Sequence, residues 1–229
     1  MTRRATIEML EMAAHALGEL REEVVLVGGA IVALLVTDPA APEVSSTKDL
    51  DIVVSITSLA GYEGLRRRLR ELGFVEDTRE GAPICRFVER ERGLVVDVMP
   101  TDPRILGFAN RWFPLAHATA DSHPLPSGRR LRITSAPCFL ATKLEAFDSR
   151  GEGDWTGSKD VEDLLAVIHG REAVVGEVEA SSEAVRTYLA QRAGLLLASV
   201  DFLRSIEGHL PGEDAGVVIE RLRGMAALA

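Results

Sequence analysis

The sequence predicts an α+β protein: a mixed sheet with flanking helices, followed by a C-terminal helical bundle. Short apolar segments typical of strands alternate with helical patterns up to residue 134. Beyond that residue the apolar positions recur only at helical spacing. The 229 residues are 46% hydrophobic, which is enough for a sizeable core. We therefore divide the chain into an α/β part, residues 1–134, and a helical part, residues 135–229.

The α/β part contains helical and strand patterns in alternation. Helices are predicted over residues 4–20, 30–36, 58–72 and 104–116, and strands over 23–27, 49–56, 74–77, 83–90, 93–100 and a hairpin within 117–134. Ser58 is a favoured N-cap residue and Gly73 a favoured helix terminator, so they bound the third helix. Gly93 and Gly128 are expected in the turns of the last two hairpins.

In the helical part, a first helix starts at residue 135, with Pro137 in its first turn. A second helix covers residues 158–170 and ends at Gly170. Two or three further helices are expected over residues 171–229.

Composition excludes several classes of function. The net charge of -9 argues against a protein that coats long nucleic acid. The basic clusters 66–70 and 129–132 read either as local basic patches or as solvated faces. Two cysteines, Cys85 and Cys138, exclude a disulfide scaffold. The first helix is amphipathic rather than a signal peptide. We therefore expect a cytoplasmic protein with no membrane partner.

Two aspartates open the predicted strand 49–56. Because strand side chains alternate, Asp49 and Asp51 share one face, while the other face, formed by Leu50, Ile52 and Val54, is directed toward the core. Asp97 follows the same pattern in strand 93–100. Three like charges repel one another unless a cation compensates them, and carboxylate oxygens suit Mg²⁺ or Mn²⁺. The alternative interpretation is that Asp49 caps a turn and Asp97 pairs with an arginine.

A strand, two glycines and a helix start follow one another at residues 23–36. Backbone N–H groups and a helix dipole near Gly28 and Gly29 would suit a phosphate. Neither the P-loop motif nor the Rossmann spacing is present, so the turn alone is a weak indication.

Lys143 lies on the apolar face of its predicted helix, between Phe139 and Phe147. A lysine there needs either an anionic partner or a path for its stem to reach water. The first possibility indicates a phosphate or acidic site, and the second is a structural role. Asp160 is similarly open to two interpretations, because a carboxylate in the first turn also stabilises a helix N-terminus.

These segments resemble the DNA polymerase beta-like nucleotidyltransferase superfamily. The resemblance rests on the Gly-Gly turn, "TKDLDIVV", the aspartate of "VVDVMP", and "LATKLEAF" followed by "GSKDVEDLLAVI", and it covers residues 20–170. The chain is most similar to the bacterial AbiEii-type nucleotidyltransferase proteins, which include toxins of toxin–antitoxin systems. It departs from the stricter pattern in two respects. The turn reads Gly-Gly-Ala rather than Gly-Ser, which removes a hydroxyl contact to phosphate, and the stretch between the glycines and the aspartates is long, with a Pro- and Ala-containing loop at residues 38–48.

The resemblance implies a nucleotidyltransferase-like fold and a role for each candidate in the α/β part. Gly28 and Gly29 would contact the nucleotide phosphates, and Asp49 and Asp51 would hold the metal ions. Asp97 would be a further metal ligand or a general base.

In the helical part, the resemblance implies that Lys143 and Asp160 complete the catalytic site, with Lys143 also binding the nucleotide. We expect these two residues and the three aspartates to line one cleft.

The implied function is a Mg²⁺-dependent nucleotidyltransferase that moves NMP from an NTP donor to an acceptor hydroxyl. The acceptor could be tRNA, a protein or a small molecule, and no sequence feature separates these. One form of this function is the toxin of a toxin–antitoxin pair, with an antitoxin protein as partner. The alternative is a catalytically degenerate nucleotide-binding or regulatory protein on the same fold, since the phosphate-binding hydroxyl is missing.

Overall fold

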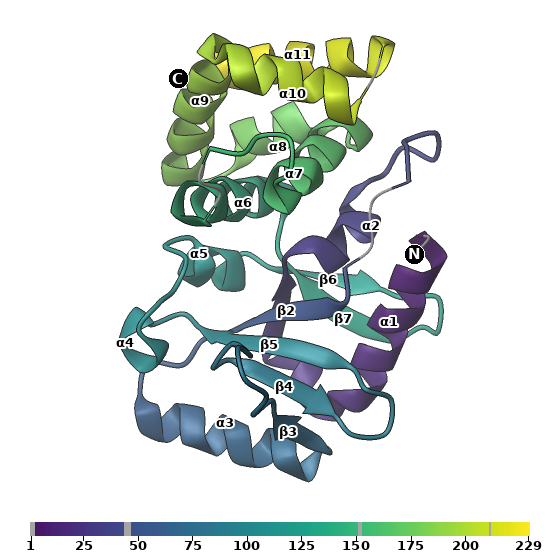
Figure 1. Cartoon of the computed structure of the whole chain (residues 1–229), viewed down its shortest axis with the longest axis vertical. Helices are drawn as coiled ribbons and strands as arrows, with labels where there is room; N and C mark the ends of the chain where they lie inside the picture. Colours follow the sequence, from purple (N-terminus) through teal and green to yellow (C-terminus); the bar gives the residue numbers. More distant parts are fainter. Residues whose placement is uncertain (1–2, 44–46, 151–152, 211) are drawn as a thin grey trace. The chain divides into compact units, whose positions relative to one another are not determined.

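The computed structural model describes residues 3–43, 47–150, 153–210 and 212–229. The chain forms two compact units: an α/β unit, Met1–Ala33 with Ser45–Ser135, and a helical unit, Leu34–Val44 with Ala136–Ala229. The predicted α+β class is confirmed, with strands in the first unit and helices from α6 onward (Figure 1). Residues 34–43, which the sequence-based division places in the α/β part, belong to the helical unit.

The α/β unit is built on one mixed sheet. Within the described residues it has seven strands in the order β3-β4-β5-β2-β1-β7-β6. Their bounds are β1 Val24–Val27, β2 Asp49–Val54, β3 Phe74–Glu76, β4 Arg86–Glu89, β5 Val95–Pro100, β6 Asp121–Pro124 and β7 Arg130–Ile133. Strand β2 pairs antiparallel with β1 and parallel with β5, so the strand that carries Asp49 and Asp51 lies in the middle of the sheet.

Helices and short 3₁₀ segments accompany this sheet. They are α1 Arg3–Ala16, η1 Gly18–Glu22, η2 Gly29–Ile31, α2 Val32–Leu35, α3 Leu59–Glu71, α4 Pro103–Leu106 and α5 Phe113–Ala118. Ser58 caps α3 as predicted, because its Oγ accepts from the Gly61 amide at 3.1 Å. The Tyr62 hydroxyl donates to the Val98 carbonyl at 3.1 Å and so fixes α3 to β5.

Two helix predictions for the α/β unit need correction. The first helix ends at Ala16, and the chain continues as the short 3₁₀ segment η1. The helix expected over residues 104–116 is two short helices. Gly107 adopts a left-handed conformation at φ 82° and its amide bonds to the Pro103 carbonyl, which closes α4 before α5 begins.

The helical unit has α6 at its centre. The described helices of this unit after α2 are α6 Ala136–Arg150, α7 Lys159–Gly170, α8 Val174–Ala180, α9 Glu183–Ala198, α10 Val200–His209 and α11 Glu213–Ala226. Helix α6 packs against α7, α8 and α9, and most of its residues are buried. In the described part of the region after residue 170 there are four helices, one more than the two or three expected.

Residues 34–43 join the helical unit through the end of α7. The amides of Thr37 and Asp38 both donate to the Gly170 carbonyl at 2.9 Å. A Cβ on Gly170 would lie 2.6 Å from Val36 Cγ1, so this approach requires glycine. Within the described ranges, the helices are too short or too polar to span a lipid bilayer.

Candidate functional site

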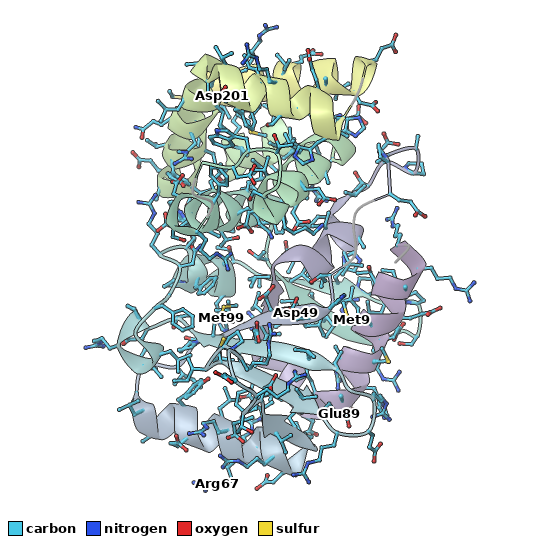
Figure 2. The ribbon with its side chains drawn as sticks, in the orientation of Figure 1. Met9, Asp49, Arg67, Glu89, Met99 and Asp201 are labelled. Atoms are coloured by element: carbon cyan, nitrogen blue, oxygen red, sulfur yellow. The ribbon has the colours of Figure 1, made fainter. Side chains whose placement is uncertain are left out.

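The three predicted aspartates lie on neighbouring strands and face the same side of the sheet. In the strand register, Asp51 of β2 lies opposite Asp97 of β5 and, on its other side, opposite Val27 of β1. Asp49 precedes Asp51 by two residues, so its side chain lies on the same face. Asp49 is the first residue of β2 and is labelled in Figure 2. The register of the central strands therefore confirms that the three aspartates share one face of the sheet, as the alternation of polar and apolar residues predicted.

Arg86 belongs to the same row of residues. It lies opposite Asp97 in the antiparallel pairing of β4 with β5. Its Nε donates to Asp97 Oδ1 and its Nη2 to Asp97 Oδ2, each at 2.8 Å, and Nη2 also donates to Asp49 Oδ2 at 2.8 Å. The interpretation in which Asp97 pairs with an arginine is thus correct, and the arginine is Arg86, which was not among the residues predicted from the sequence.

The hydrogen bond to Asp97 and the nearby charges of Asp97 and Asp49 outweigh burial and raise the pKa of Arg86. The guanidinium therefore stays cationic. The side chain of Asp49 is 34% exposed and that of Asp97 is 12% exposed, so the open side of the cluster is at Asp49. The second oxygen of Asp49, Oδ1, accepts from the Thr47 hydroxyl at 2.8 Å.

Gly28 directly follows strand β1 and lies beside Asp51. Its φ of 69° lies in the left-handed region, and a Cβ there would lie 2.7 Å from Asp51 Cγ. Both the backbone conformation and the close approach therefore require glycine. Gly29 follows as the first residue of the short segment η2. The glycine turn and Asp51 form one local structure, although a role in phosphate binding stays a prediction.

The donor chemistry of this cluster fits a hard divalent cation. Asp49, Asp51 and Asp97 offer carboxylate oxygens on one face, as Mg²⁺ and Mn²⁺ prefer. Across the described parts of the chain, however, no three acidic, histidine or cysteine side chains are arranged to share one ion. Arg86 already bridges two of the three carboxylates. The cluster therefore fits a cation that takes only part of its ligands from the protein.

A second charged cluster lies within the helical unit. Lys143 Nζ donates to Asp160 Oδ1 at 3.0 Å and to Asp163 Oδ2 at 2.7 Å. The Lys143 side chain is 9% exposed and that of Asp163 is 0% exposed. The idea that Lys143 extends to water is therefore wrong. Lys143 has anionic partners, and they come from the protein itself.

Two further cations border this cluster. Arg150 Nη2 donates to Asp160 Oδ2 at 3.2 Å. Lys159 Nζ lies 3.1 Å from Asp163 Oδ1 but without hydrogen-bond alignment, so this contact is only electrostatic. Burial by itself would lower the pKa of Lys143, but the attraction of Asp163 and Asp160 outweighs burial and raises it. Lys143 is held charged and in a fixed position.

Asp163 is not among the site residues predicted from the sequence. The available signal was its position three residues after Asp160, which places both carboxylates on one face of α7. Ser158 is at the N-cap position of α7, but its side chain makes no capping hydrogen bond. The predicted convergence of Lys143 and Asp160 with the aspartates of the α/β unit stays a prediction.

The basic cluster on α3 is a solvated face. Arg66 and Arg70 both pair with Glu76, and Arg68 makes a two-fold contact with Glu23. Arg67 extends from α3 away from the sheet (Figure 2). The ion pairs neutralise most of the cluster, which argues against a local basic patch.

No family model matches the chain, and no curated protein matches it significantly. Among solved structures it is similar to an antigenic nucleotidyltransferase-like protein from Paracoccidioides brasiliensis, with 19% sequence identity and a TM-score of 0.50. The match covers 73% of this chain and 77% of that one. The likeness shows a nucleotidyltransferase-like fold.

Proposed function

We propose that the protein is a nucleotidyltransferase that uses Mg²⁺ or Mn²⁺ to move NMP from an NTP to an acceptor hydroxyl. The observation that carries the proposal is the row of carboxylates on β2 and β5, beside the glycine turn at the end of β1. The nucleotidyltransferase-like fold supports it. A bound cation would neutralise phosphate charge and lower the pKa of an attacking hydroxyl.

In this proposal the residues of the α/β unit hold the cation and the phosphates. Asp49 and Asp51 are the first metal ligands, and Asp97 is the third carboxylate of the set. Gly28 has no side chain and so allows Asp51 to pack directly against the turn, which brings the backbone of the turn next to the proposed metal ligand. With Gly29 it is the proposed nucleotide contact. Positioning and charge neutralisation account for most of the catalysis of such a transfer.

For the helical unit, the proposal gives Lys143 and Asp160 a part in nucleotide binding and catalysis, on the strength of the sequence resemblance. The ion pairs with Asp160 and Asp163 keep Lys143 protonated and limit its motion. A fixed ammonium group is suited to stabilising charge that develops on a phosphate. The same ion pairs also give Lys143 a structural role. A test of its function therefore has to separate an effect on stability from an effect on nucleotide transfer.

The acceptor is proposed at the level of a hydroxyl group: a tRNA end, a protein side chain or a small molecule. The net charge of -9 favours an acceptor that makes a small contact with the protein over a long RNA. A toxin that modifies such an acceptor and is neutralised by an antitoxin protein is the most specific form of the proposal, and the AbiEii-type resemblance supports it.

A second candidate is a nucleotide-binding or regulatory protein without catalysis. The observation that favours it is Arg86, which pairs with two of the three carboxylates. The missing hydroxyl in the Gly-Gly-Ala turn also favours it.

One experiment separates the two candidates. The purified protein is incubated with each α-labelled NTP, Mg²⁺ and either cell extract or total tRNA, and labelled products are resolved by size and nuclease or protease sensitivity. Label in an acceptor, lost in Asp51→Asn, supports the transferase. Nucleotide binding without a labelled product in any mixture supports the regulatory protein.

A further inference from the structure

Arg86 lies in the carboxylate row, and we propose that it replaces one of the metal ions there. The cluster then binds a single divalent cation, through Asp49 and Asp51, while Arg86 stays on Asp97 as the second positive charge. The inference rests on the proposed function, and it specifies how many metal ions that function uses. Arg86 is a positioning residue in this scheme, since it acts through Asp97.

The strand register holds Arg86 in this place. Arg86 lies opposite Asp97 across β4 and β5, and Asp97 lies opposite Asp51 across β5 and β2. Side chains directly opposite one another in neighbouring strands are close enough to interact. The hairpin turn between β4 and β5 fixes that pairing, with the Gly93 amide bonded to the Glu89 carbonyl at 2.9 Å. The pairing register of β4 with β5 therefore places Arg86 beside Asp97.

The geometry of the contact keeps Asp97 paired with Arg86, so that Asp97 does not bind the metal ion. The planar guanidinium bonds to both Asp97 oxygens, the two-fold arrangement that arginine makes best. The Asp97 side chain is 12% exposed, and breaking a largely buried ion pair to free one partner is costly. A metal ion would more easily displace the contact at Asp49. The Asp49 side chain is more exposed than those of Arg86 and Asp97, and only one of its oxygens accepts from Arg86.

The charges of the cluster also indicate a single bound divalent cation. The three carboxylates carry three negative charges and Arg86 one positive charge, so two negative charges remain. One divalent cation balances them, whereas two would leave the cluster positive. Mg²⁺ commonly binds through one or two carboxylates and completes its shell with water and substrate phosphates. Two protein ligands, Asp49 and Asp51, are therefore sufficient.

The test is a count of bound Mn²⁺ by electron paramagnetic resonance and calorimetry, with the full chain and the metal alone. Wild type is expected to bind one ion. Arg86→Gln is expected to bind two, because Asp97 is released to act as a ligand. Arg86→Gln combined with Asp97→Asn is the matched control, and it should return to one ion because the released carboxylate is gone.

Two ions in the wild type would overturn the inference, as would a single ion in Arg86→Gln. Asp97→Asn alone covers the case in which Arg86→Gln does not fold: it is expected to keep one ion, and loss of that ion would overturn the inference by making Asp97 a ligand. Failure of the proposed function gives a different result, since a wild type that binds no Mn²⁺ contradicts its metal site directly. Circular dichroism establishes that each variant is folded.

Discussion

Gly28 and Asp51 are in direct contact, and the contact leaves no room for a side chain at Gly28. A Cβ added there would lie 2.7 Å from Asp51 Cγ and 2.9 Å from Asp51 Cβ. The two residues are held in place by the pairing of β1 with β2, in which Val27 lies opposite Asp51. A larger residue at position 28 must therefore move either the turn or the carboxylate that we propose as a metal ligand.

Gly28→Ala is expected to lower Mn²⁺ affinity by about tenfold or more, the usual cost of disturbing the support of a metal ligand. The matched control is Gly93→Ala. Gly93 has nearly the same φ, 67° against 69°, but a Cβ there meets nothing within 4 Å. Both variants bear the strain of an alanine at positive φ, on the order of 1–3 kcal/mol and larger at position 28, where the ψ of -167° is essentially restricted to glycine; only Gly28→Ala also displaces Asp51. Equal Mn²⁺ affinities of the two variants would contradict the prediction.

Asp49→Asn and Asp51→Asn are each expected to reduce nucleotide transfer to background without unfolding the protein. The reason is that an amide is a much weaker ligand than a carboxylate for a hard cation. The measurement is label transfer from NTP, with circular dichroism as the check on folding. Full activity in the double variant would rule out the metal site.

Asp49→Asn should also change the stability of the metal-free protein. Removal of like charge alone would be expected to relieve repulsion, but Asp49 already compensates Arg86. Asp49→Asn is therefore expected to lower the melting temperature of the metal-free protein, because it removes one of the charge-assisted bonds of Arg86. An increase in melting temperature would show that repulsion dominates at Asp49.

Much of the carboxylate row could be predicted from the sequence, because buried residues fix the register of a strand. The apolar residues of β2 leave Asp49 and Asp51 on the other face by alternation alone. Arg86 could also have been found: a hairpin that turns at residues 91–92 places it opposite Asp97. The parallel pairing of β2 with β5 could not, since no local signal specifies which distant strands become neighbours.

The helical cluster shows the same limit. Lys143 on an apolar face indicated an anionic partner, and the spacing of Asp160 and Asp163 on α7 was available. That the partners of Lys143 come from α7 depends on how α6 and α7 pack. Likewise, residues 34–43 join the helical unit because of hydrogen bonds to the end of α7, at Gly170. Neither association follows from local sequence.

Lys143→Met is expected to destabilise the protein by about 3 kcal/mol, because it leaves the buried Asp163 without its closest partner. Lys159→Met is the control: Lys159 contacts the same carboxylate but is 41% exposed, and its removal is expected to cost about 1 kcal/mol or less. Urea denaturation measures both. A similar cost for the two variants would show that the burial of Lys143 has no energetic consequence.

Lys143→Met combined with Asp163→Leu separates structure from function. Replacing both members of a buried ion pair by apolar residues is often neutral, so this double variant is expected to regain most of the lost stability. If Lys143 acts on the nucleotide as we propose, the stable double variant still transfers no label. Wild-type transfer by this variant would restrict Lys143 to a structural role.

The pH dependence of stability provides a final test of the Lys143 ion pairs. Attraction to Asp163 and Asp160 outweighs the effect of burial and raises the pKa of Lys143 above its ordinary value of 10.5. A group with a raised pKa in the folded state contributes stability that is fully present below the unfolded-state pKa and is lost as the pH rises through the folded-state value. The difference in unfolding free energy between wild type and Lys143→Met should therefore stay constant from about pH 7 to about pH 10 and decrease only above this range. A decrease that begins near neutral pH would mean that burial dominates and that Lys143 is easily deprotonated.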